Sequence, residues 1–213
     1  MKRPVIFWDV DTQHDFMDAD GKLYVPNAEA IKPALKRLTD YAHERQFDIV
    51  ASADDHQPGD PELSATPDLR ETFPEHCMHG TPGARKIDET ALFAPLVIEP
   101  NAESHESLAR TLWSHSGDVL IRKRRFDVFS NPNTGTLLDA WDPTEIVVYG
   151  VALDVCDRFA IDGFIERGVP EIHLVLDATK AIHEEAVAPL LERWKADGVH
   201  VVSTADVLAG RVV

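Results

Sequence analysis

Residues 147–156 read VVYGVALDVC, and this stretch predicts both the fold and the position of its chemistry. Its first half is a short apolar run rich in β-branched residues, which is typical of a buried parallel strand. Cys156 then begins a helical pattern that includes Phe159, Ala160 and Phe164. A cysteine between a strand and a helix lies where α/β sheets bind ligands, and the helix dipole there favours thiolate. Cys156 is therefore a candidate nucleophile, although most free cysteines are inert buried side chains.

Composition narrows the class of protein. The chain has 213 residues, of which 44% are hydrophobic, so we expect one domain covering residues 1–213. Its formal net charge of −16 argues against nucleic acid or an anionic membrane as a partner. Two cysteines, Cys77 and Cys156, do not suggest a disulfide framework, and no apolar run has membrane-spanning length. These features favour a cytoplasmic protein.

Apolar runs alternate with helical patterns along the chain. The predicted strands cover residues 4–11, 47–53, 118–123, 145–150, 171–177 and 199–203, with a short accessory strand at 96–98. The predicted helices cover residues from Asn27 to Tyr41, 102–114, the segment around Leu138, the segment after Cys156, and 184–197. The sequence thus predicts a three-layer α/β fold, with a six-stranded, mostly parallel sheet and helices on both faces. The polar segment 54–92 is too long for an ordinary connection, which indicates a functional loop.

Polar side chains follow several predicted strands. Asp11 follows the first, Lys123 the third and Cys156 the fourth, and parallel strands bring such ends to one edge of the sheet. Asp11 could accept the thiol proton and return it to a leaving amine, while Lys123 holds the thiolate. The N–H groups of Ala152 and Cys156 could bind an oxyanion. Singly, Asp11 reads as a turn residue and Lys123 as a surface lysine; together they indicate acyl transfer through a thioester.

A second group of side chains is suited to a metal ion. Asp54 and His56 lie two residues apart in an extended segment and so share one face. His76, in the long loop, could be a third ligand. A carboxylate with two imidazoles suits Zn²⁺, Fe²⁺ or Mn²⁺ with positions left open for water or substrate. The alternative is that both are ordinary loop histidines, since the chain has ten.

Four segments of the chain match the motifs of one enzyme family. They are DTQHDFM at 11–17 for the D-x-Q-x-D-F motif, DDH at 54–56 for the metal D-x-H, FPEHCMHGTPGA at 73–84 for P-x-H-C-x-x-x-T-P-G-A, and GVALDVC at 150–156 for G-V-A-T-D-x-C. They follow the family's order and extend across nearly the whole chain. With these segments the chain resembles the isochorismatase-like cysteine hydrolases, and nicotinamidases in particular.

The resemblance implies a Rossmann-like isochorismatase fold, a dimer or tetramer, and a role for each matched residue. The implied roles are a catalytic triad of Asp11, Lys123 and Cys156; metal ligands Asp54, His56 and His76, usually for zinc or iron; a cis peptide between Val151 and Ala152 that turns N–H groups toward the oxyanion; and Phe16 and Phe73 against an aromatic substrate ring. The implied activity is hydrolysis of a small amide, most closely nicotinamide to nicotinate and ammonia.

Three residues depart from the nicotinamidase pattern. Asp55 replaces the usual Trp of D-W-H, Leu153 replaces Thr, and Asp157 replaces the common Val or Ala after the cysteine. A fourth protein ligand, Glu62 or Ser64, is left open. The departures leave a cysteine hydrolase intact and keep another small cyclic or linear amide as an alternative substrate.

Two further interpretations remain open. Residues 5–12 also fit the h-h-h-h-D-x-D-x-[TV] opening of haloacid-dehalogenase-like phosphatases, with Asp9 as nucleophile, Asp11 as acid/base and Mg²⁺ as cofactor. That interpretation leaves Cys156 and the segment 73–84 without a role. The chain could also be a non-catalytic binding protein that retains the shape of the site.

Overall fold

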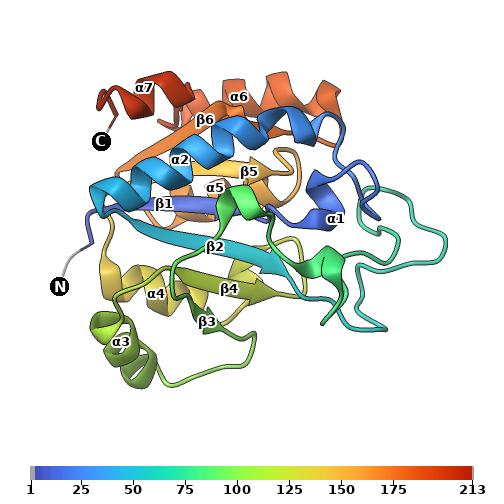
Figure 1. Cartoon of the computed structure of the whole chain (residues 1–213), viewed down its shortest axis with the longest axis horizontal. Coiled ribbons are helices and arrows are strands. Elements are labelled where there is room, and N and C mark those ends of the chain that lie inside the picture. Colours follow the sequence, from blue (N-terminus) through green and yellow to red (C-terminus); the bar gives the residue numbers. More distant parts are fainter. Residues whose placement is uncertain (1–2, 213) are drawn as a thin grey trace.

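A computed structural model describes residues 3–212. Its centre is one seven-stranded sheet in the order β3-β4-β2-β1-β5-β6-β7, and every paired strand is parallel (Figure 1). The strands are β1 Val5–Val10, β2 Asp48–Asp54, β3 Leu96–Ile98, β4 Val119–Lys123, β5 Glu145–Val151, β6 Glu171–Lys180 and β7 His200–Val202. The predicted fold class is confirmed, but the predicted count of six strands is wrong.

The additional strand is β3, which the sequence marked only as an accessory segment. Leu96–Ile98 pairs with β4 at one edge of the sheet. Three residues are too few for hydrophobic periodicity to distinguish a strand from a loop. Only the position beside β4 makes this segment part of the sheet.

Helices cover both faces of the sheet. They are α1 His14–Met17, α2 Lys32–Arg45, α3 His105–Ser114, α4 Thr134–Trp141, α5 Cys156–Glu166, α6 Val187–Ala196 and α7 Thr204–Leu208. In Figure 1, α2 crosses the front of the sheet, whereas α4 and α5 lie behind it. The helix expected from Asn27 begins only at Lys32, because a 3₁₀ turn at Ala28–Ile31 comes first. No helix among residues 3–212 is both long and apolar enough to cross a membrane.

Strand β1 shows how the two faces are packed. Neighbouring side chains on a strand point to opposite faces, so Phe7 and Trp8 contact different layers. Phe7 lies 6.2 Å from Tyr41 of α2, between ring centroids, and Trp8 lies 4.7 Å from Phe164 of α5. Both side chains are fully buried. This two-sided burial makes β1 a central strand, with its carboxyl end enclosed by neighbouring strands.

The order of the strands creates the crevice in which the site lies. From β1 the chain moves to β2, then to the edge strand β3, then back to β4 between them, and it later crosses to the other side of β1 as β5. The strand order therefore reverses between β1 and β5, and ligands of open α/β sheets bind at such a reversal. Gly150 lets the backbones of β1 and β5 approach closely at this point, because a Cβ atom at residue 150 would lie 2.1 Å from the Val10 carbonyl oxygen.

Asp157 links the start of α5 to β6 through a buried polar contact. Its Oδ2 lies 2.6 Å from the Thr179 hydroxyl, and its Oδ1 has no hydrogen-bond partner among the described residues. Burial raises the pKa of this carboxyl from 3.8 to about 8, against the opposing effect of the Thr179 hydrogen bond. Asp157, one of the three residues that depart from the nicotinamidase pattern, is therefore a protonated acid at neutral pH.

We expect Asp157→Asn to change how stability depends on pH. Between pH 3.8 and about 8 the unfolded chain releases a proton that folded Asp157 keeps, so the free energy of unfolding falls as pH rises through this window. Asparagine does not titrate, so the free energy of unfolding of the variant should not fall in this way. Relative to wild type it should rise by roughly a few kcal/mol toward the upper end of the pH window. Urea unfolding across this pH window measures the difference, and Asp40→Asn, at an exposed position of α2, is the control. Parallel curves for wild type and Asp157→Asn would contradict this account of Asp157.

Candidate active site

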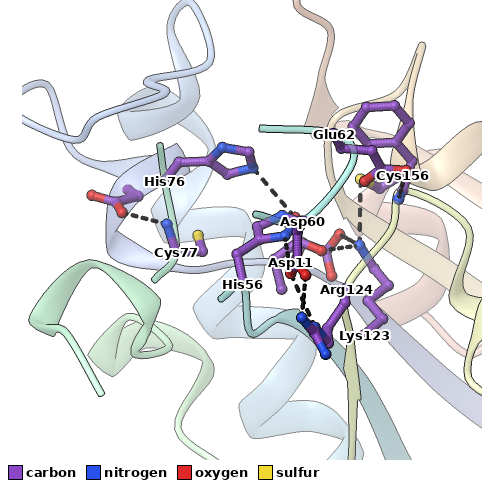
Figure 2. Close-up of polar contacts among 12 residues, drawn as sticks. Asp11, His56, Asp60, Glu62, His76, Cys77, Lys123, Arg124 and Cys156 are labelled. Carbon is purple, nitrogen blue, oxygen red and sulfur yellow. Dashed lines mark hydrogen bonds and ion pairs between the residues drawn. The ribbon is translucent and has the colours of Figure 1, made fainter. Parts of the chain in front are cut away.

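Lys123 occupies the centre of the site. Its Nζ lies 2.8 Å from Asp11 Oδ2, 2.5 Å from Asp54 Oδ1 and 3.6 Å from Cys156 Sγ (Figure 2). The register of β2 and β4 places Asp54 directly beside Lys123, while β1 and α5 supply the other two residues. Burial alone would lower the pKa of the Lys123 ammonium, but the two carboxylates raise it well above its usual value. The lysine is therefore a buried permanent cation.

Asp11 is held beside the thiol. The Ser52 hydroxyl donates to Asp11 Oδ1 at 2.7 Å, and Asp11 Oδ2 contacts Lys123. One carboxylate oxygen from each of Asp11 and Asp54 and the Cys156 sulfur all lie within 4.8 Å of one another. Burial raises the pKa of Asp11, although Lys123 opposes the effect. A carboxylate of raised pKa next to a thiol is suited to accept its proton.

Cys156 is the first residue of α5, as the sequence predicts, but its protonation differs from the prediction. The side chain is buried, and this burial raises the pKa of the thiol well above its usual value despite the nearby Lys123 charge. The Lys123 charge therefore does not offset the cost of burying a thiolate. A carboxylate oxygen of Asp11 lies within 4.8 Å of the sulfur, so Asp11 is the adjacent proton acceptor.

The backbone before Cys156 presents two N–H groups. The peptide between Val151 and Ala152 is cis, as the family resemblance implies. In this turn, the N–H groups of Leu153, Val155 and Asp157 donate to the carbonyls of Lys180 and Ala152. The N–H groups of Ala152 and Cys156 have no backbone acceptor within residues 3–212, so both can donate to a substrate oxygen.

Asp54, His56 and His76 come together as a second cluster. Asp54 Oδ2 lies 3.7 Å from His56 Nε2 and 3.6 Å from His76 Nε2, and one ligand atom from each residue falls within 4.8 Å of the others. All three residues are buried, and His56 Nε2 has no hydrogen-bond partner among the described residues. A buried nitrogen without a partner, facing a carboxylate and a second imidazole, fits a divalent metal ion.

The loop that carries His76 is held by residues of the D-x-Q-x-D-F stretch. Gln13 donates to the Asp54 carbonyl at 2.8 Å and accepts from the Asp54 N–H at 2.7 Å. Asp15 accepts a 2.6 Å hydrogen bond from the N–H of Cys77. Both residues belong to the motif, but the sequence alone does not indicate what they bind. They fix the backbone on either side of the metal cluster.

Aromatic rings flank the metal cluster. Phe16 and Phe73 are buried, and their ring centroids lie 5.3 Å and 6.4 Å from that of His76. Phe126, which the sequence did not indicate, packs edge-on against Phe73 at 5.5 Å. The two predicted substrate-binding residues therefore lie where they could contact a flat ring next to the metal cluster.

The open question of a fourth ligand concerns Glu62. Its Oε1 accepts from the Phe126 N–H at 3.1 Å, and its Oε2 is buried with no hydrogen-bond partner among the described residues. Glu62 does not join the described cluster of Asp54, His56 and His76. Asp55 turns away to pair with His79, whose Nδ1 lies 2.9 Å from it.

Asp9 does not occupy the position that the phosphatase alternative needs. Its carboxylate accepts hydrogen bonds from Thr12 at 2.8 Å and from Lys86 at 2.6 Å, and its side chain is buried. Both oxygens are thus bound within the protein. The arrangement matches a structural acid and not an accessible nucleophile.

Comparisons with known proteins show similarity over most of the chain, in both sequence and fold. The chain is 27% identical to the nicotinamidase/pyrazinamidase of Mycobacterium tuberculosis over 92% of this chain and 97% of that protein. It is 23% identical to a probable inactive nicotinamidase of Arabidopsis thaliana, over 83% of this chain and 80% of the relative. The fold matches the pyrazinamidase of Pyrococcus horikoshii in complex with zinc, with a TM-score of 0.72, 24% identity, and coverage of 93% of this chain and 98% of that one.

The match to a family model is broader than any single motif. The isochorismatase domain model covers residues 6–206, which includes the sheet from the second residue of β1 to the end of β7 and every candidate site residue. This match also speaks against the phosphatase alternative. The chain therefore belongs to the isochorismatase family of hydrolases.

Proposed function

We propose that this protein is a metal-containing cysteine amidohydrolase that converts a small amide, with nicotinamide as the first candidate, into its acid and ammonia. The observation that carries the proposal is the position of Lys123, whose ammonium contacts Asp11, Asp54 and Cys156 at once. This one cation connects a nucleophile, a proton acceptor and a metal ligand. Hydrolysis through a thioester uses all three.

The chemical steps follow from the positions of the groups. Asp11 takes the proton of the Cys156 thiol, and the sulfur attacks the amide carbon. The N–H groups of Ala152 and Cys156 bind the oxygen as it becomes negative. Asp11 returns the proton to the amide nitrogen, the C–N bond breaks, and ammonia leaves a thioester on Cys156. Water, deprotonated by Asp11, then cleaves the thioester, giving the acid and restoring the thiol.

Asp54, His56 and His76 would hold the metal, with zinc favoured and iron or manganese as alternatives. When bound, the ion supplies a Lewis-acidic anchor for a nitrogen of the substrate ring. Asp54 also contacts Lys123, so the metal cluster and the catalytic residues share one carboxylate.

The choice of substrate is supported by two independent facts. Phe16 and Phe73 lie beside His76, where they would enclose a flat ring. The M. tuberculosis relative is named nicotinamidase/pyrazinamidase. A different small amide is the alternative, because the fold also matches the N-carbamoylsarcosine amidase of Thermoplasma acidophilum, with a TM-score of 0.68 and 22% identity. We further propose a single-domain cytoplasmic enzyme that assembles as a dimer or tetramer.

The purified protein should release ammonia from nicotinamide at about 1–10³ s⁻¹. Cys156→Ala should lower this rate by at least about 10³-fold, because no other group can form the thioester. Coupled ammonia detection measures both. Cys77→Ala is the matched control. This buried cysteine lies in the loop that carries His76, and its thiol takes part in none of the proposed steps.

Iodoacetamide labelling distinguishes the possible failures. If Cys156 is labelled and another amide protects it, but nicotinamide is not hydrolysed, the hydrolase proposal stands and the substrate is that other amide. Undiminished turnover in Cys156→Ala would overturn the mechanism. A protein with neither turnover nor a reactive Cys156 would support the non-catalytic alternative.

Removal of one imidazole should remove the metal. We expect wild type to carry about one zinc per chain after zinc loading and buffer exchange, and His76→Ala to carry a small fraction of this. Elemental analysis gives the content. His79→Ala is a close control, because His79 lies three residues away, is exposed and pairs with Asp55. Equal zinc in wild type and His76→Ala would remove His76 from the ligand set.

A further inference from the structure

Asp60 is a buried carboxylate that binds the outer side of His56. Its Oδ2 lies 3.3 Å from His56 Nδ1 and accepts a 2.9 Å hydrogen bond from the Gln57 N–H. The opposite ring nitrogen, His56 Nε2, is the one that faces Asp54. The two acids therefore contact the two nitrogens of a single imidazole.

Arg124 completes this arrangement from the outside. Its Nε donates to Asp60 Oδ2 at 3.0 Å and its Nη2 donates to Asp60 Oδ1, which is the two-pronged contact that a guanidinium makes with a carboxylate. The Asp60 side chain is only 4% exposed, whereas that of Arg124 is 41% exposed. Figure 2 shows Arg124, Asp60 and His56 in one group. Arg124 thus supplies the counter-charge for a carboxylate that solvent barely reaches.

The arginine follows Lys123 directly in the chain. Consecutive residues at the end of β4 therefore reach two different places, since Lys123 contacts the catalytic residues and Arg124 contacts the outer side of the metal cluster. His76 provides a comparison, because its Nδ1 lies 2.7 Å from the Pro74 carbonyl and not from a carboxylate. Both imidazoles place Nε2 toward Asp54, but only His56 has a carboxylate at its Nδ1.

We propose that Asp60 and Arg124 form a positioning pair that holds the proton of His56 on Nδ1 and keeps its Nε2 available to a metal ion. The inference rests on the metal cluster of the proposed function and extends it to two residues outside the ligand set. A carboxylate on the outer nitrogen of a histidine ligand fixes the tautomer and ring orientation and strengthens the donor nitrogen. Arg124 holds Asp60 in this rotation, because its Nε and Nη2 groups bind the two oxygens of the carboxylate and leave Oδ2 against His56 Nδ1.

Zinc affinity tests the pair without any substrate. Metal-free protein is titrated with Zn²⁺ in competition with a chromophoric chelator. We expect Asp60→Ala to weaken zinc binding by about 10–100-fold. Arg124→Gln should weaken it by a smaller factor, and Arg124→Lys should restore part of the loss because it keeps the charge but not the two-pronged contact. Arg125→Gln, at the next and exposed position, should bind zinc like wild type.

A second measurement separates positioning from a general effect on folding. Long-range ¹H–¹⁵N spectra of the metal-free protein report which ring nitrogen of each histidine carries the proton. In Asp60→Ala we expect His56 to lose its preference for the Nδ1–H form while His76 keeps its own. A merely structural role would disturb both imidazoles or neither.

The outcomes are distinct from those of the proposed function. If wild type, Asp60→Ala and Arg124→Gln all bind zinc equally well, the positioning pair is overturned and the proposed hydrolase is unaffected. Wild type that binds no zinc overturns the metal cluster and this inference together. Should Asp60→Ala fail to fold, Arg124→Gln at the more exposed position decides the question. Failure to hydrolyse nicotinamide has no bearing on the zinc result.

Discussion

The contact between the Lys123 ammonium and the carboxylates of Asp11 and Asp54 is the interaction on which the site depends. Two carboxylates this close in a dry interior would repel each other, and one would take up a proton. The lysine allows both to remain near Cys156. In turn, burying an ammonium requires such partners, because an unpaired charge in the core is strongly destabilising. The candidate catalytic residues and the candidate metal ligands therefore stabilise one another.

The sheet makes this arrangement possible. Lys123 and Asp54 are register partners on β4 and β2, so their side chains are adjacent by construction. Asp11 follows the neighbouring β1, and Cys156 follows β5 across the point where the strand order reverses. The loop that carries His76 is less regular. Gln13 donates to its Ala84 carbonyl and Asp15 accepts from its Cys77 N–H, and these bonds hold its backbone in place. We infer that rigid strands position the chemical groups, whereas a loop with many side-chain hydrogen bonds completes the metal cluster.

Much of this site could be predicted because its residues carry local signals. Cys156 stands between an apolar strand and a helical pattern, and the polar residues stand at strand ends, where topology gathers them. The structure brings together each residue set that the sequence proposed for the triad and for the metal. The contributions of Ser52, Asp60 and Phe126 could not be predicted, because each acts through a partner far away in the chain or through the backbone. The pKa of Cys156 was predicted wrongly for a related reason: the helix N-terminus is visible in sequence, but the extent of burial is not.

By itself, the sequence determined the α/β class, the parallel strands, and the identity of the candidate nucleophile, acid, lysine and metal ligands. The fold class follows from hydrophobic periodicity, and the candidate residues at strand ends follow from their kinds of side chain, which are properties of short segments. The full triad and ligand set, including His76 in the long loop, also depends on the family motifs that the sequence resembles. Only the tertiary structure decided that Leu96–Ile98 is a seventh strand, that Asp157 is a buried acid with a pKa of about 8, and that Arg124 and Asp60 support His56. Each of these depends on which distant residues lie nearby and on how completely water is excluded, and both arise only when the whole chain is folded.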